Sequence, residues 1–212
     1  MTLNLYLMRH GETEASRLGV YTGSTDVDLT SEGLAMAEAF SETYRHLSWQ
    51  AVFCSPLKRA VSTATPFCQA TGLEMQLRDG LKEMLFGEWE GLSFEAVQTQ
   101  FSDDYYNWMT EPAWNPPTGG ETGMQVASRA AAVLAEIEHQ FTEGNVLVIS
   151  HKTTIRLMLC NLLGMDIGRY RDRITMPVAS VSLLQFGKYG PMLVKHGDRS
   201  HLPTDLEARP GT

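Results

Sequence analysis

The stretch that decides the fold of this chain is Leu3-Asn4-Leu5-Tyr6-Leu7-Met8-Arg9-His10-Gly11-Glu12-Thr13. Its apolar residues predict a short β-strand that ends where two basic side chains and a glycine begin. An isolated Arg-His pair is more often a polar strand end than a functional site. A functional interpretation of Arg9 and His10 therefore depends on partners elsewhere in the chain.

Composition and charge exclude several classes of protein. The 212 residues are 43% hydrophobic and 20% charged, which is typical of a globular protein, and no apolar run is long enough to cross a bilayer. The formal net charge of -8 argues against a nucleic-acid partner, because such proteins present a basic face. An anionic ligand must therefore be bound by a local cluster of basic residues.

The three cysteines, Cys54, Cys68 and Cys160, lack Cys-x-x-Cys spacing and lie among apolar neighbours. We expect them to be free, buried thiols. The N-terminal residues show no signal-peptide pattern, so we expect a cytoplasmic protein with no membrane partner.

The remaining sequence alternates strand-like and helix-like patterns, which predicts one α/β domain over residues 1–212. Strands are expected at 51–54, 73–77 and 146–149, with a hairpin formed by 179–186 and 192–194. Helices are expected to begin at Thr30, Ser55-Pro56, Thr122 and Thr153. The tail after His201 is predicted to be frayed.

Residues 84–120 interrupt this alternation and are predicted to form a lid or side-wall insertion. The stretch 93–114 favours one or two short helices, ended by prolines and glycines. Its aromatic residues are expected to pack the insertion rather than to line the substrate. They are Tyr105, Tyr106, Trp108 and Trp114.

Three expected strands are each followed within a few residues by a basic group. Arg9 and His10 follow the first, Arg59 follows the second, and His151 follows the strand at 146–149. Ligands of open α/β sheets bind outside the carboxyl ends of the strands, so these groups are predicted to converge on one crevice. Two of these strand ends also lead into helices, whose free N–H groups favour anions. Together they indicate a phosphate site.

Five ordered motifs, spread over residues 3 to about 165, carry a resemblance to a known family. They are Leu7-Met8-Arg9-His10-Gly11-Glu12-Thr13, Ser55-Pro56-Leu57-Lys58-Arg59-Ala60, Glu83 before Phe86-Gly87-Glu88-Trp89-Glu90-Gly91, Gly119-Gly120-Glu121-Thr122, and Val148-Ile149-Ser150-His151. The sequence resembles the histidine phosphatase superfamily and, more narrowly, its phosphoglycerate mutase-like branch. The resemblance implies a three-layer α/β/α sandwich with a mostly parallel sheet.

The resemblance also implies residue roles. His10 would be the nucleophile that becomes phosphorylated, Glu83 would be the proton donor, and Arg9, Arg59 and His151 would hold the phosphoryl group. Thr22 and Gly23 are expected near the substrate, and the backbone N–H of Lys152 could face the phosphate. No metal or organic cofactor is expected. The expected partner is a small-molecule phosphate monoester, with a homodimer left open.

The chemistry of these residue types supports those roles. Phosphoryl transfer requires positioning and neutralisation of the phosphoryl oxygens, which arginines provide with a bidentate fork. His10 must be neutral to attack, and nearby cations favour its neutral form. One carboxylate can protonate the leaving alkoxide and then deprotonate water. Glu83 fits best, although Glu88 and Glu90 lie close in sequence.

Departures from the family pattern separate hydrolysis from the alternatives. Glu14-Ala15-Ser16 replaces a common Trp-Asn pair, and Lys152 replaces a common glycine. No adjacent arginine pair for a substrate carboxylate occurs between Glu83 and Gly119, so a phosphatase is favoured over a phosphoglycerate mutase. A non-catalytic phospho-ligand binding module is disfavoured because every catalytic residue type is present. A metal site at His196, Asp198 and His201 is also disfavoured, because no further well-spaced ligand accompanies them.

Overall fold

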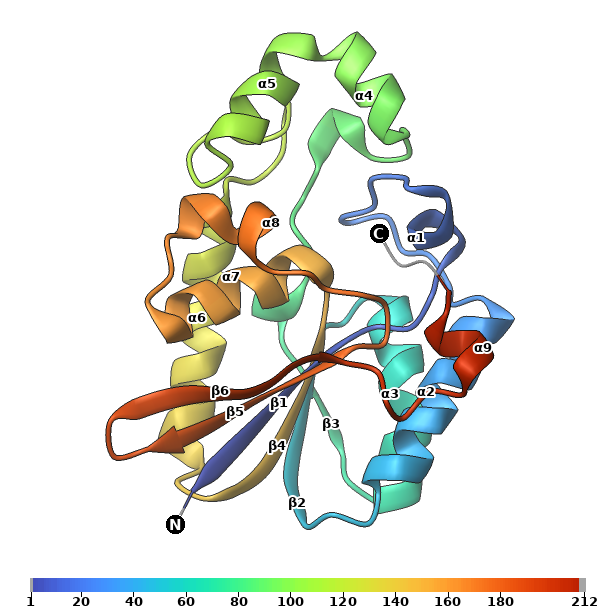
Figure 1. Ribbon diagram of the computed structural model, residues 1–212, viewed down its shortest axis with the longest axis vertical. Helices are drawn as coiled ribbons and strands as arrows, with labels where there is room; N and C mark the ends of the chain where they lie inside the picture. The colour runs from blue at the N-terminus through green and yellow to red at the C-terminus, as the bar shows by residue number, and fades with distance from the viewer. Residues whose placement is uncertain (1, 210–212) are drawn as a thin grey trace.

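The computed structural model describes residues 2–209 and contains a mixed sheet of six strands in the order β3-β2-β4-β1-β5-β6 (Figure 1). The strands are β1 (Leu3–Arg9), β2 (Trp49–Cys54), β3 (Met75–Leu77), β4 (Gly144–Ser150), β5 (Val181–Gly187) and β6 (Gly190–Asp198). The first four strands in chain order pair in parallel, whereas β5 and β6 form an antiparallel hairpin on β1. The carboxyl ends of β1, β2 and β4 therefore meet at one edge.

Helices cover both faces of this sheet, which confirms the expected three layers (Figure 1). One face carries α2 (Ser31–Tyr44) and α3 (Lys58–Thr71), and the other carries α6 (Gly123–Gln140) and α7 (Lys152–Leu163). Alternate residues of β4 enter different cores, since Ile149 packs in the α2–α3 core and Val148 in the α6–α7 core. This double burial explains the continuous apolar run of the strand.

Side-chain caps fix the starts of two helices where the sequence predicts them. The Thr30 hydroxyl accepts a hydrogen bond from the N–H of Gly33, and Thr122 and Gln125 form a complete capping box. The predicted start of α3 at Ser55-Pro56 is wrong, because the helix begins at Lys58. The N–H of Ser55 instead donates to the carbonyl of Ile149 at 3.0 Å, so the backbone pairing of the sheet continues through Ser55.

Two glycines let the loop after β1 pass close to α2. A Cβ at Gly11 would lie 2.4 Å from the carbonyl oxygen of Gly33, and a Cβ at Gly33 would lie 2.1 Å from that of Glu12. Directly after this crossing the chain forms α1 (Glu14–Leu18) with its own capping box. No hydrophobic periodicity predicts α1, because five residues are too few to define a helical face.

The segment that follows β3 carries the aromatic residues of the predicted lid. It contains two 3₁₀ turns, η1 (Asp79–Leu81) and η2 (Gly87–Trp89), followed by α4 (Phe94–Gln100) and α5 (Ser102–Thr110). The ring centroids of Trp89 and Trp108 lie 5.3 Å apart in an edge-to-face contact. Tyr106 and Trp114, in contrast, are 68% and 67% exposed and contribute little to this packing. The expectation that all four aromatic residues pack the segment is therefore wrong for these two.

The predicted fraying of the tail after His201 is wrong for residues 202–209, and the rest of that prediction lies outside the described residues. His201 is buried against Phe40 and Tyr44, and Leu202 and Leu206 join the α2–α3 core. This part of the chain also contains η3 (Ile167–Arg169) and α8 (Tyr170–Arg173) before the hairpin, and α9 (Thr204–Glu207) after it. The tail is ordered because its apolar side chains complete a core that the earlier helices leave open.

An ion pair links this tail to the loop after β1. Arg209 donates from Nε and Nη2 to the two carboxylate oxygens of Glu12, both at 2.8 Å, and the Glu12 side chain is 0% exposed. Thr30 donates a further hydrogen bond to the same carboxylate at 2.9 Å. Loss of the arginine would leave a buried carboxylate without its charged partner, which is costly.

We expect the Arg209→Ala variant to melt at a temperature about 5–10 °C lower than the parent. Differential scanning calorimetry at neutral pH would measure the shift. Arg45→Ala is the matched control, because it removes the exposed Arg45–Glu42 pair and should move the melting temperature by at most about 2 °C. Equal shifts for the two variants would show that the Glu12 pair adds no more than a surface pair.

The predictions about membrane-spanning segments and cysteines also concern residues that the structure describes, 2–209. No helix in this range is long and apolar enough to cross a membrane. The three cysteines are free as expected, with Cys54 and Cys160 buried and Cys68 only partly buried.

Candidate active site

The parallel register brings the first and last basic motifs together. Arg9 is paired with Ser150 in the register of β1 and β4, and the N–H of His10 donates to the carbonyl of Ser150 at 3.0 Å. Consequently the rings of His10 and His151 lie with their centroids 5.1 Å apart, although 141 residues separate them in the sequence.

The hydrogen bonding of His10 leaves one ring nitrogen available for attack. Its Nδ1 lies 2.7 Å from the carbonyl oxygen of Gly11, and a carbonyl can only accept, so Nδ1 carries the proton. Nε2 then keeps its lone pair. Burial, with the nearby guanidinium groups of Arg59 and Arg9, lowers the pKa of His10 well below 6.5. The imidazole is therefore neutral at pH 7, as nucleophilic attack requires.

His151 is held by two polar neighbours. Arg59 donates from Nε to Nδ1 of His151 at 3.2 Å, which makes Nδ1 the acceptor, and Nε2 lies 2.7 Å from Oγ of Ser55. Burial and the charge of Arg59 lower the pKa of His151 well below 6.5. Ser55 was interpreted from the sequence as a helix cap, so its contact with the histidine was missed. The one signal in the sequence for the contact between Ser55 and His151 is that Ser55 directly follows a strand, β2, as His151 follows β4.

Arg59, the second residue of α3, is held by backbone carbonyls of the loop before α2. Its Nη1 donates to the carbonyl of Thr25 and its Nη2 to that of Gly23, both at 2.9 Å. The carbonyl of Thr22 lies 3.4 Å from Nη2. A Cβ at Gly23 would lie 2.2 Å from the carbonyl oxygen of Met84, so only glycine fits there. Thr22 and Gly23 thus contact Arg59 through their backbone.

Glu90 holds the same loop in place through its carboxylate. Its carboxylate accepts hydrogen bonds from the backbone and hydroxyl groups of Ser24 and Thr25, at 2.6 to 3.1 Å. Burial opposes its ionisation, but the hydrogen bonds from Thr25 and Ser24 together lower the pKa of Glu90. Glu88 is exposed at the surface. Neither carboxylate competes with Glu83 for a place in the pocket.

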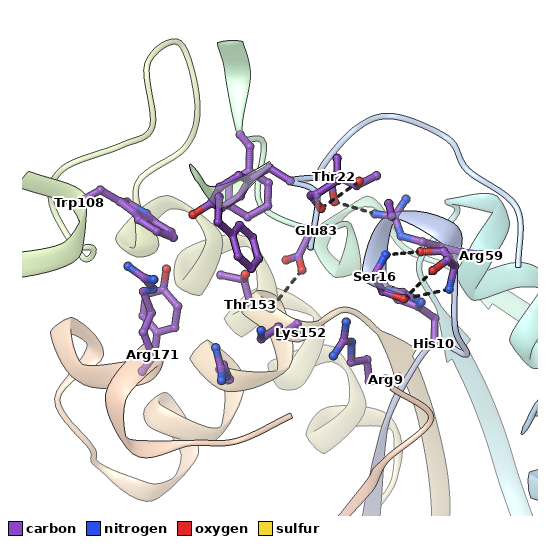
Figure 2. A pocket seen from close by; sticks show the side chains of 18 of the residues that line it. Arg9, His10, Ser16, Thr22, Arg59, Glu83, Trp108, Lys152, Thr153 and Arg171 are labelled. Atoms are coloured by element: carbon purple, nitrogen blue, oxygen red, sulfur yellow. Dashed lines mark hydrogen bonds between the residues drawn. The ribbon is translucent and has the colours of Figure 1, made fainter. Parts of the chain in front are cut away.

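Glu83 sits at the N-terminus of α7. Its carboxylate accepts from the N–H groups of Met84 at 2.8 Å, Thr153 at 3.1 Å and Thr154 at 3.3 Å. These donors hold a buried carboxylate in a fixed position at the positive end of a helix. Figure 2 shows the carboxylate between the nucleophile side of the pocket and Thr153.

Arg9 is buried beside His10, and its Nη1 donates to the carbonyl of Met176 at 2.5 Å. Burial lowers the pKa of Arg9 to about 9, so the guanidinium stays charged at pH 7. Arg9, one of the two arginines predicted to hold the phosphoryl group, is therefore a cation beside His10.

One pocket of about 210 Å³ collects most of the predicted site residues (Figure 2). Its lining includes Arg9, His10, Thr22, Arg59, Glu83 and Lys152. His151 and Gly23 are absent from this lining and contact Arg59 instead. Ala15 and Ser16 of α1 also line the pocket. They belong to the stretch Glu14-Ala15-Ser16, which replaces the Trp-Asn pair that is common in the family, so the asparagine amide of that pair is missing here.

Residues 2–209 contain no group of three or more His, Cys, Asp or Glu side chains placed to hold a metal ion. Nδ1 of His196 lies 3.1 Å from the Ser182 hydroxyl, and His201 packs in the aromatic tail contact.

Comparison with known proteins shows the family of the chain. The family model for the histidine phosphatase superfamily (branch 1) matches residues 5–199. The chain belongs to this superfamily. The chain is 32% identical over 168 residues to phosphoserine phosphatase 1 of Hydrogenobacter thermophilus, covering 79% of this chain and 80% of that protein. It is 34% identical over 167 residues to the adenosylcobalamin/alpha-ribazole phosphatase of Escherichia coli, covering 77% and 80%.

The fold is shared with solved members of the histidine phosphatase superfamily. The mycobacterial glucosyl-3-phosphoglycerate phosphatase, solved in complex with VO3, superposes with a TM-score of 0.81 at 26% identity, covering 92% of this chain and 98% of that one. The predicted family, the α/β/α fold with a mostly parallel sheet and the phosphomonoesterase class are confirmed.

Proposed function

We propose that this histidine phosphatase hydrolyses small phosphate monoesters through a phosphohistidine on Nε2 of His10. The observation that carries the proposal is the contact between Nδ1 of His10 and the Gly11 carbonyl, which leaves the Nε2 lone pair free on a neutral ring. Arg9 and Arg59 place two cations beside that nitrogen, where they would stabilise charge on the phosphoryl oxygens.

In the first step the Nε2 lone pair forms a bond to phosphorus while the ester P–O bond breaks. The leaving oxygen takes a proton from the carboxyl group of Glu83, and the Nδ1–H of the resulting phospho-imidazolium remains bound to the Gly11 carbonyl. In the second step Glu83 takes a proton from water, the water oxygen bonds to phosphorus, and the P–N electron pair returns to Nε2. Inorganic phosphate leaves and both groups are restored.

His151, Thr22 and Gly23 have supporting roles in this proposal. The guanidinium of Arg59 contacts His151 and the carbonyls of the loop, so these residues orient Arg59 toward the phosphoryl group. The segment 84–120 serves as a side wall, because Phe86, Phe94, Tyr105 and Trp108 line the pocket. Lys152 is the first residue of α7, and the next residue, Thr153, donates its N–H to Glu83.

Phosphoglycerate mutase remains the alternative from the same family. Such an enzyme would return the phosphoryl group to a second hydroxyl instead of water. With 3-phosphoglycerate we expect release of inorganic phosphate to exceed formation of 2-phosphoglycerate, measured by phosphate assay and by ³¹P NMR of the same reaction. If isomerisation of 3-phosphoglycerate were faster than hydrolysis of every ester in a phosphate-monoester panel, the enzyme would be a mutase.

The relatives are named for different phosphorylated compounds, phosphoserine and alpha-ribazole phosphate among them. What their names share is phosphatase activity, which supports a phosphate monoester as the substrate class we propose. We place the enzyme in the cytoplasm because its cysteines are free thiols. A homodimer stays a prediction, which light scattering would check.

A further inference from the structure

The pocket carries more positive charge than one phosphoryl group needs. Five cationic side chains line it, and Glu83 is the single carboxylate among the lining residues. The five are Arg9, Arg59, Lys152, Arg156 and Arg171. Glu83 carries a proton when it acts as the acid, and Lys152 is only partly protonated because its pKa is about 7, so a phosphoryl dianion would neutralise two of the four arginine charges. Two cations would remain without a counter-charge inside a small, partly enclosed volume.

The excess cations gather away from the nucleophile. Arg171 lies with Trp108 on the side of the pocket opposite His10 and Arg59, with Glu83 and Lys152 between the two sides (Figure 2). Lys152 and Arg156 lie four residues apart on α7, so their side chains share one helix face. Arg171 and Tyr170 come from α8. The wall formed by these four residues is called the distal wall below.

The ion pairs found within residues 2–209 include none of the three cations of the distal wall, Lys152, Arg156 and Arg171. Arg171 instead stacks its guanidinium 3.6 Å from the centroid of the Trp108 ring. Burial, followed by the charges of Arg9 and Arg156, lowers the pKa of Lys152 to about 7. Mutual repulsion of this kind is relieved when an anion binds.

Three buried polar atoms at this wall also lack partners. They are the hydroxyl of Tyr170, Nε of Arg156 and Nε1 of Trp108, and all three residues line the pocket. Tyr170 is only 1% exposed and Trp108 only 4%. Buried polar groups in native proteins are nearly always hydrogen-bonded, and every one of these atoms can donate. A wall of donors and cations is suited to an anionic acceptor.

We propose that the distal wall is a second anion site, and that the physiological substrate is a small phosphate monoester with a second acidic group remote from its ester oxygen. This inference rests on the proposed function for the orientation of the substrate, with the ester phosphate at His10. The second group is a carboxylate or a second phosphate, because both accept hydrogen bonds from guanidinium, ammonium and phenol donors.

Four esters that differ only at the distal end test the proposal. They are 3-phosphonooxypropanoate, propane-1,3-diyl bisphosphate, 3-hydroxypropyl phosphate and 3-aminopropyl phosphate. We expect kcat/KM for the carboxylate or the bisphosphate to exceed that of the hydroxyl compound about tenfold or more, the effect of one charged hydrogen bond. The amine should be the slowest. The better of the two anionic esters identifies the acidic group.

Variants of the distal wall test whether these residues cause the preference. Arg156→Met and Arg171→Met should each reduce the ratio of anionic to hydroxyl ester to less than about threefold. Because the ratio compares two substrates of one preparation, partial misfolding of a variant cancels. Arg173→Met is the matched control, since Arg173 is an exposed arginine of the same helix outside the pocket lining and its loss should leave the ratio unchanged.

Equal kcat/KM values for the four esters, or an anionic preference that survives both Met variants, would overturn the second anion site. Hydrolysis of p-nitrophenyl phosphate, which has no acidic group at the distal end, reports the proposed function separately. If p-nitrophenyl phosphate is not hydrolysed, the proposed function fails. The distal wall is then judged by the same ratios of dissociation constants, measured for the four esters by isothermal titration calorimetry.

Discussion

Replacing His10 with alanine is expected to lower kcat for phosphate-ester hydrolysis by about 10⁴-fold or more, because His10 is the single histidine among the residues that line the pocket. Direct attack by water would forgo the covalent intermediate and its two smaller barriers. The measurement is steady-state release of inorganic phosphate, combined with acid-free trapping of ³²P-labelled enzyme during turnover. The parent protein should carry label on one histidine and the variant should carry none.

His139→Ala is the control for this experiment. His139 lies near the exposed end of α6, outside the pocket lining, so its loss should leave kcat and labelling unchanged. If the His10→Ala variant still became labelled, the nucleophile would have to be another residue, and His151 would be the first to test. The geometry argues against His151, because it lies outside the pocket lining with Nδ1 bound to Arg59 and Nε2 beside Ser55.

Replacing Glu83 with glutamine is expected to reduce kcat for alkyl phosphates by about 10²–10⁴-fold, the usual contribution of a general acid. Glutamine keeps one oxygen, which can accept from the N–H groups of Met84 and Thr154 as Oε1 of Glu83 does, whereas its amide nitrogen replaces the oxygen that accepts from Thr153. What the variant loses is the proton that the leaving alkoxide requires.

The leaving group separates the two tasks of Glu83. p-Nitrophenolate is stable without a proton, so phosphorylation of His10 by p-nitrophenyl phosphate should remain fast in Glu83→Gln. Attack of water on the phosphohistidine should still be slow, because the general base is missing. Stopped-flow absorbance should therefore show a burst of p-nitrophenol equal to the active enzyme. Glu88→Gln, an exposed neighbour, should behave as the parent, and equal losses for alkyl and p-nitrophenyl esters without a burst would remove the acid-base role.

The residues that sequence reasoning identified are those whose signals are local. Arg9, His10 and His151 each follow a short apolar run, and the parallel topology expected for such runs brings their ends to one edge. The helix caps at Thr30 and Thr122 are likewise local, because each cap and its hydrogen-bond partner lie within four consecutive residues. Glu83 was singled out from Glu88 and Glu90 by resemblance, and the pocket contains only Glu83.

The features that were missed depend on contacts between distant segments. Ser55 has cap-like sequence neighbours, yet its hydroxyl lies beside His151, 96 residues further along the chain. Arg209 pairs with a carboxylate 197 residues away, which no periodicity reports. The distal wall combines residues of α7 with residues of α8 that stack on an indole from α5, so its charge imbalance is visible only in the assembled pocket.

The Arg209–Glu12 pair has a practical consequence for handling the protein. Glu12 lies two residues beyond His10, so the last described turn of the chain is anchored beside the catalytic loop. Leu3 lies at the opposite end of β1, next to Gly144 at the start of β4 (Figure 1). An affinity tag or fluorophore fused ahead of β1 would stand a full strand length from the nucleophile, whereas the same fusion after Arg209 would crowd the loop that carries it.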